Sequence, residues 1–378
     1  MKNIYIICSS LNIGGAEMQS VWLANKLTTF GFNVNFVVLK NSTMLTKFIS
    51  RDVNLIEYKM YSGNKNKNFV KFRKLYNFLY GSYLLRKKLI NRDAIVFSFL
   101  FHANIFGFLA TFLSSSKHII CIRNDRFSSR SSTSNIWTRN LLISLTSFFS
   151  YKIVFNSKKS LAKLNRTLGN KNNHLVIPNA VVNFKDDLDK NILKKLSYFL
   201  DGSKTKILSV GRLEPIKNYG NILKAMSILK KSDLDFKFVI FGKGYLEQEL
   251  KEYINNNDLD DSVLMMGAVK NAVNYMELFD YFLLASIHEG FPNSLIESMS
   301  KGLIPFATDS GDSFEIISNN RGIKIENTQP ESIAYSINNF LDSTEEKSFS
   351  EIEHNIKNYI QKDLNEANII KQWLSLIK

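Results

Sequence analysis

Cysteine and proline are scarce in this chain of 378 residues, which has two cysteines, five prolines and only 17 glycines. So few turn-forming residues argue against long disordered or low-complexity tracts. Cys8 and Cys121 are far apart, and no group of cysteines and histidines has the spacing of metal ligands, so we expect two reduced structural thiols and no metal site. The length fits two globular domains.

No segment of the sequence predicts export or a membrane span. The apolar run at residues 3–8 is too short for the core of a signal peptide, and turn residues follow it. Residues 94–113 carry no formal charge and are long enough for a transmembrane helix, but His102 and Asn104 lie near their middle, where hydrocarbon would penalise them. We expect a buried strand, a polar turn and a buried helix there instead.

Acidic residues are rare in the first half of the chain. Residues 1–180 hold 26 Lys and Arg against five Asp and Glu, residues 181–378 hold 23 against 29, and the whole chain has a net charge of +15. Nucleic acid and anionic lipid both fit so basic a half, and a merely solvated basic surface is the alternative. Residues 69–89 mix aromatic and basic side chains, which fits a plain crossover helix or one that also contacts a membrane.

Short apolar runs alternate with helical patterns along the whole sequence, which predicts an α/β fold with parallel sheets. A polar, charged segment at 184–203 separates two such series and is the expected interdomain segment. We therefore expect two doubly wound, Rossmann-like domains at 1–183 and 184–360, with a C-terminal helix at 361–378 that packs back on the first domain.

Glycines occupy turns between a strand and a helix, where the backbone can approach a phosphate closely. Gly14 and Gly15 form one such turn, and Gly242 and Gly244 form another. Neither turn completes the dinucleotide fingerprint, because Glu247 stands where its third glycine would be, so a nicotinamide site is disfavoured. A purely steric turn is the alternative for the first pair.

Charged residues lie on two other loops that follow strands. Arg212 and Lys217 share a loop at the carboxyl end of a strand, where a guanidinium fork and a point charge could hold a diphosphate; ordinary surface charge is the alternative. Glu289 and Glu297 are eight positions apart in HEGFPNSLIE, with Glu289 on the loop and Glu297 about one turn inside the following helix. Carboxylates so placed can accept hydrogen bonds from sugar hydroxyls.

Three of the candidate residues also have plain structural interpretations. Ser294 and Glu297 have the spacing of a capping box, so Glu297 could cap its own helix, and Glu289 could be a surface acid. His102, at the end of an apolar strand, could be a buried structural histidine.

Together these features resemble the retaining glycosyltransferase family 4, which has the GT-B fold of two Rossmann-like domains facing across a cleft. The resemblance spans nearly the whole chain and is densest from 206 to 311. The pair Glu289 and Glu297 matches the family's E-x7-E motif, GRLEPIKN its Arg/Lys loop, FGKG its G-x-G turn, and IGGAE its Gly-Gly loop. LMMGAV is similar to the strand before its base-binding loop, and VIPNAV to the segment usually written I-P-N-G-V, with Ala180 in place of glycine.

The resemblance implies a role for each residue. Arg212 and Lys217 would stabilise the diphosphate leaving group, Glu297 would bind the ribose and Glu289 the transferred sugar, and His102 would lie near the donor sugar. Glu289, His102, Arg212 and Lys217 form the catalytic set. The implied donor-binding set is Gly14, Gly15, Arg212, Lys217, Gly242, Gly244, Val269, Glu289, Gly290, Phe291, Asn293, Ser294, Leu295 and Glu297, with backbone amides of Gly15 and of 293–295 holding phosphate and sugar.

The resemblance also implies that no metal and no other cofactor is needed. The D-x-D spelling occurs at Asp187 and Asp189, in the expected interdomain segment rather than in a suitable loop. Cationic side chains and a helix N-terminus would replace the charge of the metal. Retention without an evident enzymic nucleophile suggests front-face attack, with the departing phosphate helping to deprotonate the acceptor.

The expected reaction moves a hexose or N-acetylhexosamine from a nucleotide diphosphate sugar, UDP before GDP, to a polyprenyl-diphosphate-linked or growing bacterial glycan of a capsule or O-antigen. The basic N-terminal domain would place the enzyme in the cytoplasm, on the anionic inner face of the membrane, and no nucleic-acid partner is expected because no binding motif is present. The alternatives are a nucleotide-sugar epimerase on the same fold, a basic nucleic-acid-binding protein and, least favoured, a dehydrogenase.

Overall fold

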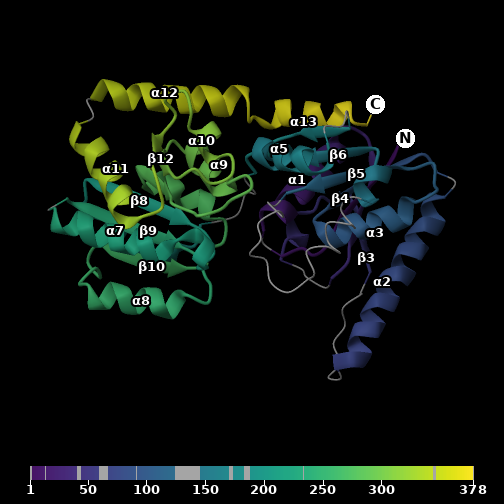
Figure 1. Cartoon of the computed structure of the whole chain (residues 1–378), viewed down its shortest axis with the longest axis horizontal. Coiled ribbons are helices and arrows are strands. Elements are labelled where there is room, and N and C mark those ends of the chain that lie inside the picture. The colour runs from purple at the N-terminus through teal and green to yellow at the C-terminus, as the bar shows by residue number, and fades with distance from the viewer. Residues whose placement is uncertain are drawn as a thin grey trace. The chain divides into compact units, whose positions relative to one another are not determined.

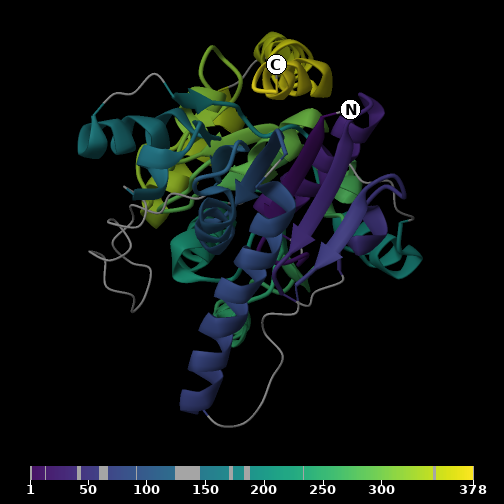
Figure 2. The same cartoon turned by 90° about the vertical axis from the view of Figure 1, so that its right-hand side faces the viewer.

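The computed structural model of the protein divides into two compact units, residues 1–182 with 369–378, and residues 183–368. It describes residues 2–12, 14–40, 44–58, 67–90, 92–123, 145–169, 173–182, 188–232, 234–343 and 346–377. Each unit is built on one parallel sheet covered by helices (Figures 1 and 2).

The first unit contains a seven-stranded sheet in the order β3-β2-β1-β4-β5-β6-β7. Every neighbouring pair is parallel, and Cys8 of β1 lies level with Phe99 of β4. The strands are β1 (Asn3–Cys8), β2 (Asn33–Val38), β3 (Asn54–Glu57), β4 (Ala94–Phe99), β5 (Lys117–Ile122), β6 (Lys152–Phe155) and β7 (His174–Val176). The helices are α1 (Gly15–Thr29), η1 (Thr46–Phe48), α2 (Lys67–Leu89), α3 (Phe101–Thr111), residues 145–149 and α5 (Lys158–Leu168).

The second unit contains a six-stranded parallel sheet in the order β10-β9-β8-β11-β12-β13. Its strands are β8 (Thr205–Val210), β9 (Phe236–Phe241), β10 (Val263–Gly267), β11 (Tyr281–Leu284), β12 (Ile304–Ala307) and β13 (Ile323–Lys324). Its helices are α6 (Lys190–Leu200), η2 (Pro215–Lys217), α7 (Tyr219–Lys231), α8 (Glu247–Asn256), η3 (Ala272–Leu278), α9 (Asn293–Ser300), α10 (Ser313–Ile316), α11 (Pro330–Ser343) and α12 (Glu346–Lys362).

Strands with apolar side chains on both faces explain why both sheets are parallel. Helices cover the two faces of a parallel sheet, so its strands are near-continuous apolar runs rather than alternating ones. All six residues of β4 are buried, as are the four of β11 and the four of β12. The two cysteines are free and buried, as the sequence predicted.

Two local predictions were wrong. Residues 102–104 form no polar turn, because α3 begins at Phe101, directly after Leu100, whose φ of 73° turns the chain between strand and helix. The expected interdomain segment 184–203 contains α6, a helix of the second unit that buries Leu196 and Leu200.

Residues 94–113 form β4 and α3, so the transmembrane interpretation is excluded there. Among the helices of the described segments, none is long and apolar enough to cross a membrane.

The C-terminal helix α13 (Glu366–Ser375) contributes to the core of the first unit, to which residues 369–378 belong. The Trp373 ring packs edge-on against Phe97 at 5.5 Å between centroids, and the Arg123 guanidinium lies 5.0 Å from the Trp373 ring centroid. Arg123 is buried and donates to the Ile177 carbonyl at 3.1 Å. A cation–π contact in a desolvated place is stronger than an exposed one, so this contact anchors the end of the chain.

Candidate functional site

The order of the strands creates a switch point in the second unit. From β8 the chain moves outward to β9 and β10, then returns to β11 on the other side of β8. In open parallel sheets, ligands bind at the carboxyl ends of the strands where the strand order reverses in this way. The loops 211–218 and 285–292 leave β8 and β11 at this point, and they carry five of the predicted site residues, which are Arg212, Lys217, Glu289, Gly290 and Phe291.

Lys217 and Glu289 form an ion pair across this switch point. Lys217 Nζ lies 2.5 Å from Glu289 Oε1, and the two side chains are 17% and 14% exposed. The Ser286 hydroxyl donates to the same carboxylate oxygen at 2.8 Å. The structure thus brings together two of the predicted catalytic residues and adds Ser286, for which the strand-end sequence YFLLAS held no recognised signal.

Asn218 fixes the loop that carries Lys217. Its backbone is left-handed, with φ of 61°, a conformation that asparagine tolerates better than most residues. Its side-chain amide donates to the Ala285 carbonyl at 3.2 Å and to the Thr328 carbonyl at 2.9 Å. These bonds tie the β8 and β11 loops together, so Asn218 is a positioning residue that the sequence analysis did not identify.

Arg212 lies on the same loop but is mostly exposed. Its guanidinium contacts Glu214 Oε1 at 2.5 Å, and 72% of its side-chain surface is accessible. Such an ion pair is weak because solvent screens it. The guanidinium can therefore exchange Glu214 for a ligand anion at small cost.

Gly242 and Gly244 have a steric role in the site. A Cβ on Gly242 would lie 2.0 Å from the Gly211 carbonyl oxygen, and one on Gly244 would lie 2.3 Å from the Leu213 carbonyl oxygen. Leu213 also donates its N–H to the Lys243 carbonyl at 3.2 Å. The two glycines therefore allow the turn after β9 to press against the Arg212 loop. Packing alone accounts for their missing side chains, and direct contact with the donor stays a prediction.

The strand next to β9 brings a further predicted residue to the same edge. The Gly242 N–H donates to the Gly267 carbonyl at 2.8 Å, so the end of β10 adjoins the glycine turn. Val269 follows two residues later, half-buried in the loop after β10.

The loop after β12 packs against the backbone of the Glu289 loop. Gly311 has φ of +56°, and a Cβ there would lie 2.2 Å from the Gly290 carbonyl oxygen. The Asp312 N–H donates to the same carbonyl at 3.3 Å, and the Thr308 hydroxyl donates to the Ser286 carbonyl at 2.8 Å. The segment from Thr308 to Asp312 therefore helps to hold the Glu289 loop in place.

Glu297 lies in α9, and the capping box does not form. The helix begins at Asn293 after Pro292, with no side-chain hydrogen bond at the cap, so Ser294 is already inside the helix. The Leu295 N–H donates to the Pro292 carbonyl at 3.1 Å, so this amide of the predicted anion-binding turn already has an acceptor. Burial raises the pKa of Glu297 to about 7. Phe291, like Glu297, is half-buried.

The first unit has its own switch point, between β1 and β4. Gly14 caps α1, and a Cβ there would lie 2.5 Å from Glu17 Oε2, so the glycine makes room for a carboxylate at the start of the helix. Burial raises the pKa of this carboxyl group. A phosphate on the Gly14 and Gly15 amides would face Glu17, a charge conflict whenever that acid is ionised.

His102 lies at the same carboxyl edge of the first sheet. It is in the first turn of α3 and exposed, so the interpretation as a buried structural histidine is wrong. His118, by contrast, is a buried histidine of this region. Burial lowers its pKa to about 3, and its Nε2 lies 2.8 Å from the Ser98 hydroxyl.

Metal ligands are not gathered anywhere in the described part of the chain. No group of three or more His, Cys, Asp or Glu side chains there could hold an ion. The charge for a diphosphate would come from Arg212 and Lys217.

Residues 189–363 match the model of the family described as glycosyl transferases group 1. The matched residues lie within the second unit, to which Lys217, Glu289 and Glu297 belong.

Three known proteins illustrate the similarity. A Campylobacter jejuni protein named N-acetylgalactosamine-N,N'-diacetylbacillosaminyl-diphospho-undecaprenol 4-alpha-N-acetylgalactosaminyltransferase is 41% identical over 103 residues, 27% of each chain. An Escherichia coli protein named UDP-Gal:alpha-D-GlcNAc-diphosphoundecaprenol alpha-1,3-galactosyltransferase is 30% identical over 203 residues, 52% of this chain and 51% of its own. The crystal structure of Anabaena HepE with UDP and glucose has a TM-score of 0.80 at 17% identity, covering 99% of this chain and 98% of that chain.

The likeness to solved structures confirms the predicted GT-B fold of two Rossmann-like units. The matches in sequence cover less: the chain spans 27% and 51% of the length of the two curated relatives.

Proposed function

We propose that this protein is a retaining hexosyltransferase that uses its second unit, which matches the group 1 family, to bind a nucleotide diphosphate sugar. UDP is the preferred nucleotide of this donor and GDP the second choice. The sugar is a hexose or an N-acetylhexosamine. The contact between Lys217 and Glu289 at the switch point carries this proposal. It places a cation for the leaving diphosphate beside a carboxylate for the hydroxyls of the transferred sugar.

Two further groups complete the proposed donor site. Arg212, exposed and weakly paired, closes on the diphosphate when the donor binds. Glu297 accepts hydrogen bonds from the ribose, and it does so best as a carboxylate. His102 of the first unit acts at the transferred sugar, and the reaction needs neither a metal nor another cofactor.

The acceptor in this proposal is a polyprenyl-diphosphate-linked glycan or a growing polysaccharide of the bacterial surface. Two relatives support it, since the names of the C. jejuni and E. coli proteins both describe acceptors linked to undecaprenol through a diphosphate. The basic first half of the chain supports a peripheral position on the anionic inner face of the membrane.

A thermal-shift panel tests the donor site. UDP-sugars, GDP-sugars and NAD are added to the wild type and to Glu297→Ala. A UDP-sugar raises the melting temperature of the wild type by several degrees, and the variant loses most of that shift. The proposal is overturned if no nucleotide sugar stabilises the wild type.

A turnover assay separates transfer from epimerisation. With a polyprenyl-diphosphate glycan present, a transferase releases UDP and lengthens the glycan, whereas an epimerase changes the sugar and releases no UDP. Activity unchanged by EDTA is expected, and loss of activity that Mg²⁺ restores would contradict metal independence.

A further inference from the structure

Helical residues 145–149 have the reverse of the usual polarity. Leu145, Phe148 and Phe149 are 45%, 68% and 54% exposed, whereas Thr146 and Ser147 are buried. A helix on the surface of a globular domain normally turns its apolar side chains inward and its hydroxyls outward. This one forgoes the stabilisation that burial of two phenylalanines would give, which indicates that its outer face meets something apolar.

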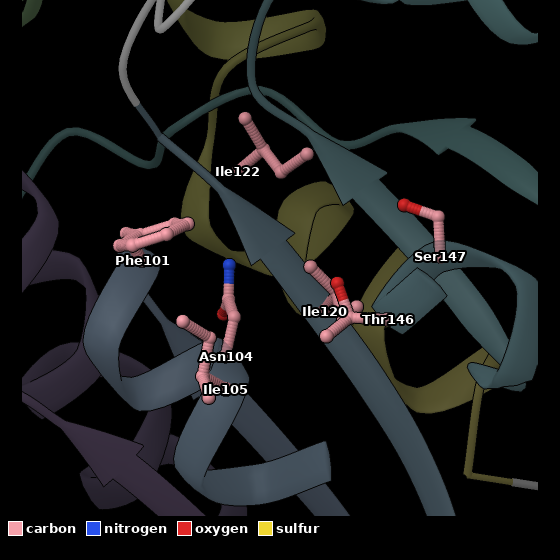
Figure 3. A pocket seen from close by; sticks show the side chains of 7 residues that line it. All are labelled: Phe101, Asn104, Ile105, Ile120, Ile122, Thr146 and Ser147. Atoms are coloured by element: carbon pink, nitrogen blue, oxygen red, sulfur yellow. The ribbon is translucent and has the colours of Figure 1, made fainter. Parts of the chain in front are cut away.

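The residue after this helix adds a third buried hydroxyl. The Ser150 hydroxyl, also buried, donates to the Ser147 carbonyl at 3.0 Å. Thr146 and Ser147 line a small cavity of about 10 Å³, room for one water molecule. The other residues that line it are Phe101, Asn104, Ile105, Ile120 and Ile122 (Figure 3).

The exposed phenylalanines belong to a larger aromatic patch that continues onto the end of α3. The Phe149 ring packs against Phe112 at 5.5 Å and against half-buried Phe108 at 5.9 Å. Leu113, the next residue along the chain, is 79% exposed. We call Leu145, Phe148, Phe149, Phe108, Phe112 and Leu113 the aromatic patch.

Basic side chains lie beside residues of the aromatic patch or next to it in sequence, and we call them the basic rim. Lys117 and Lys152 lie over the ring of Tyr151, at 4.7 and 5.8 Å from its centroid. Arg86, near the end of α2, donates to the Phe112 carbonyl, and Lys87 is exposed one residue later.

Acids are nearly absent from this part of the chain. From residue 58 to residue 180 the sequence holds 21 Lys and Arg against two acids, Asp93 and Asp125. An exposed apolar patch with a cationic rim is complementary to an anionic lipid surface. It is not complementary to a second copy of itself, because a symmetric contact would bring the same cations together.

We infer that the aromatic patch inserts into the membrane on which this enzyme works, with the basic rim on anionic head groups. The inference rests on the proposed membrane-linked acceptor, and it names the surface that makes the contact. The long helix α2, whose amino-terminal turns extend beyond the strands of its unit (Figures 1 and 2), supplies charge at its C-terminal end beside the patch.

Vesicle sedimentation tests the inference with the full chain. The double variant Phe148→Ser/Phe149→Ser binds vesicles of equal phosphatidylglycerol and phosphatidylcholine at least about 10-fold more weakly than the wild type. Tyr335→Ser, which removes a 70% exposed aromatic from the second unit, binds as the wild type does. Equal binding by the double variant and the wild type overturns the inference, as does equal loss in the control.

A second measurement does not depend on a destabilising substitution. Phe148→Trp keeps an aromatic ring in place, and brominated lipids quench its fluorescence if the ring enters the acyl region. No quenching beyond that of wild-type tryptophans, under conditions where the protein sediments with vesicles, overturns insertion. A wild type that is dimeric in light scattering and becomes monomeric in the double variant overturns it too, in favour of self-association. Donor stabilisation by UDP-sugars is measured in parallel, because its loss would refute the proposed function rather than the patch.

Discussion

Lys217 Nζ lies 2.5 Å from Glu289 Oε1, and both side chains are largely buried at the switch point of the second sheet. The ion pair joins the loop after β8 to the loop after β11, next to the backbone bond from the Ile287 N–H to the Ile216 carbonyl at 2.9 Å. Without donor, each side chain neutralises the other. In the proposed function, the diphosphate of the donor attracts Lys217 and frees Glu289 for the hydroxyls of the sugar.

A double-mutant cycle measures this coupling. Lys217→Met and Glu289→Gln each lower the free energy of unfolding by about 2 kcal/mol, because each leaves a partly buried partner unpaired. The double variant loses less than the sum, with a coupling of about 1 to 2 kcal/mol. The control pair Lys301 and Glu277, at 2.6 Å but with Glu277 65% exposed, gives about 0.5 kcal/mol or less. Equal coupling energies in the two pairs would mean that burial does not strengthen the ion pair at the switch point.

The pH dependence of stability reports on Glu297. Its pKa is raised from 4.5 to about 7 by desolvation, so the folded state holds more protons than the unfolded state between these values. The free energy of unfolding therefore falls as pH rises through this window, by about 2 to 3 kcal/mol. Urea unfolding from pH 4 to 8.5 measures it.

Glu297→Gln separates stability from donor binding. The amide cannot ionise, so the variant lacks this part of the pH dependence and is more stable than the wild type at pH 8 by about 2 kcal/mol. If Glu297 binds ribose as a carboxylate, the same variant also loses affinity for UDP-sugars, and the wild type binds them more tightly above pH 7. A variant with the wild-type pH profile would show that Glu297 titrates normally.

Alanine substitutions at two glycines test the packing beneath Arg212. Gly242→Ala forces a methyl group to within 2.0 Å of the Gly211 carbonyl oxygen, so the loop must move and donor affinity falls at least about 10-fold. Gly220→Ala is the matched control, since nothing lies within 4 Å of its added Cβ and the residue is in α7. The control gains about 0.5 to 1 kcal/mol in stability with unchanged affinity. Unchanged affinity in Gly242→Ala would show that the turn is not needed to shape the site.

Removal of the Trp373 ring loosens the first unit. Trp373→Ala opens a cavity beside Phe97 and removes the ring that the Arg123 guanidinium faces, at a cost of about 3 to 5 kcal/mol. Hydrogen exchange should accelerate in β4 and β5 and stay unchanged in β8 and β11. Trp373→Phe retains most of the packing and serves as the control. Uniform acceleration in both sheets would mean that the effect is not confined to the first unit.

The sequence predicted the loops that carry Arg212, Lys217 and Glu289 because the signals for strand ends and helix starts are local. A strand ending at Val210 and a helix beginning at Tyr219 leave Arg212 and Lys217 on one short loop, and a parallel strand order sends that loop to the carboxyl edge. The spacing of Glu289 and Glu297 likewise placed one on a loop and the other inside a helix.

Other features depended on contacts between distant segments. Nothing near Gly242 in sequence shows that its missing side chain accommodates the Gly211 carbonyl, because those residues meet only when β8 and β9 pair. The capping box failed for a local reason, since α9 begins at Asn293 with Pro292 at its N-cap, and Ser294 therefore lies inside the helix.

The sequence by itself determined the class of fold, the two series of strands and helices and the residues available for donor chemistry, because periodicity, turns and charge are properties of neighbouring residues. Only the tertiary structure decided which of those residues meet. It paired Lys217 with Glu289, packed Gly242 against the Gly211 carbonyl, and turned the phenylalanines of residues 145–149 outward. Such contacts join segments that are far apart along the chain. Burial, which raises the pKa of Glu297, and the exposure of the aromatic patch both arise only when the chain folds.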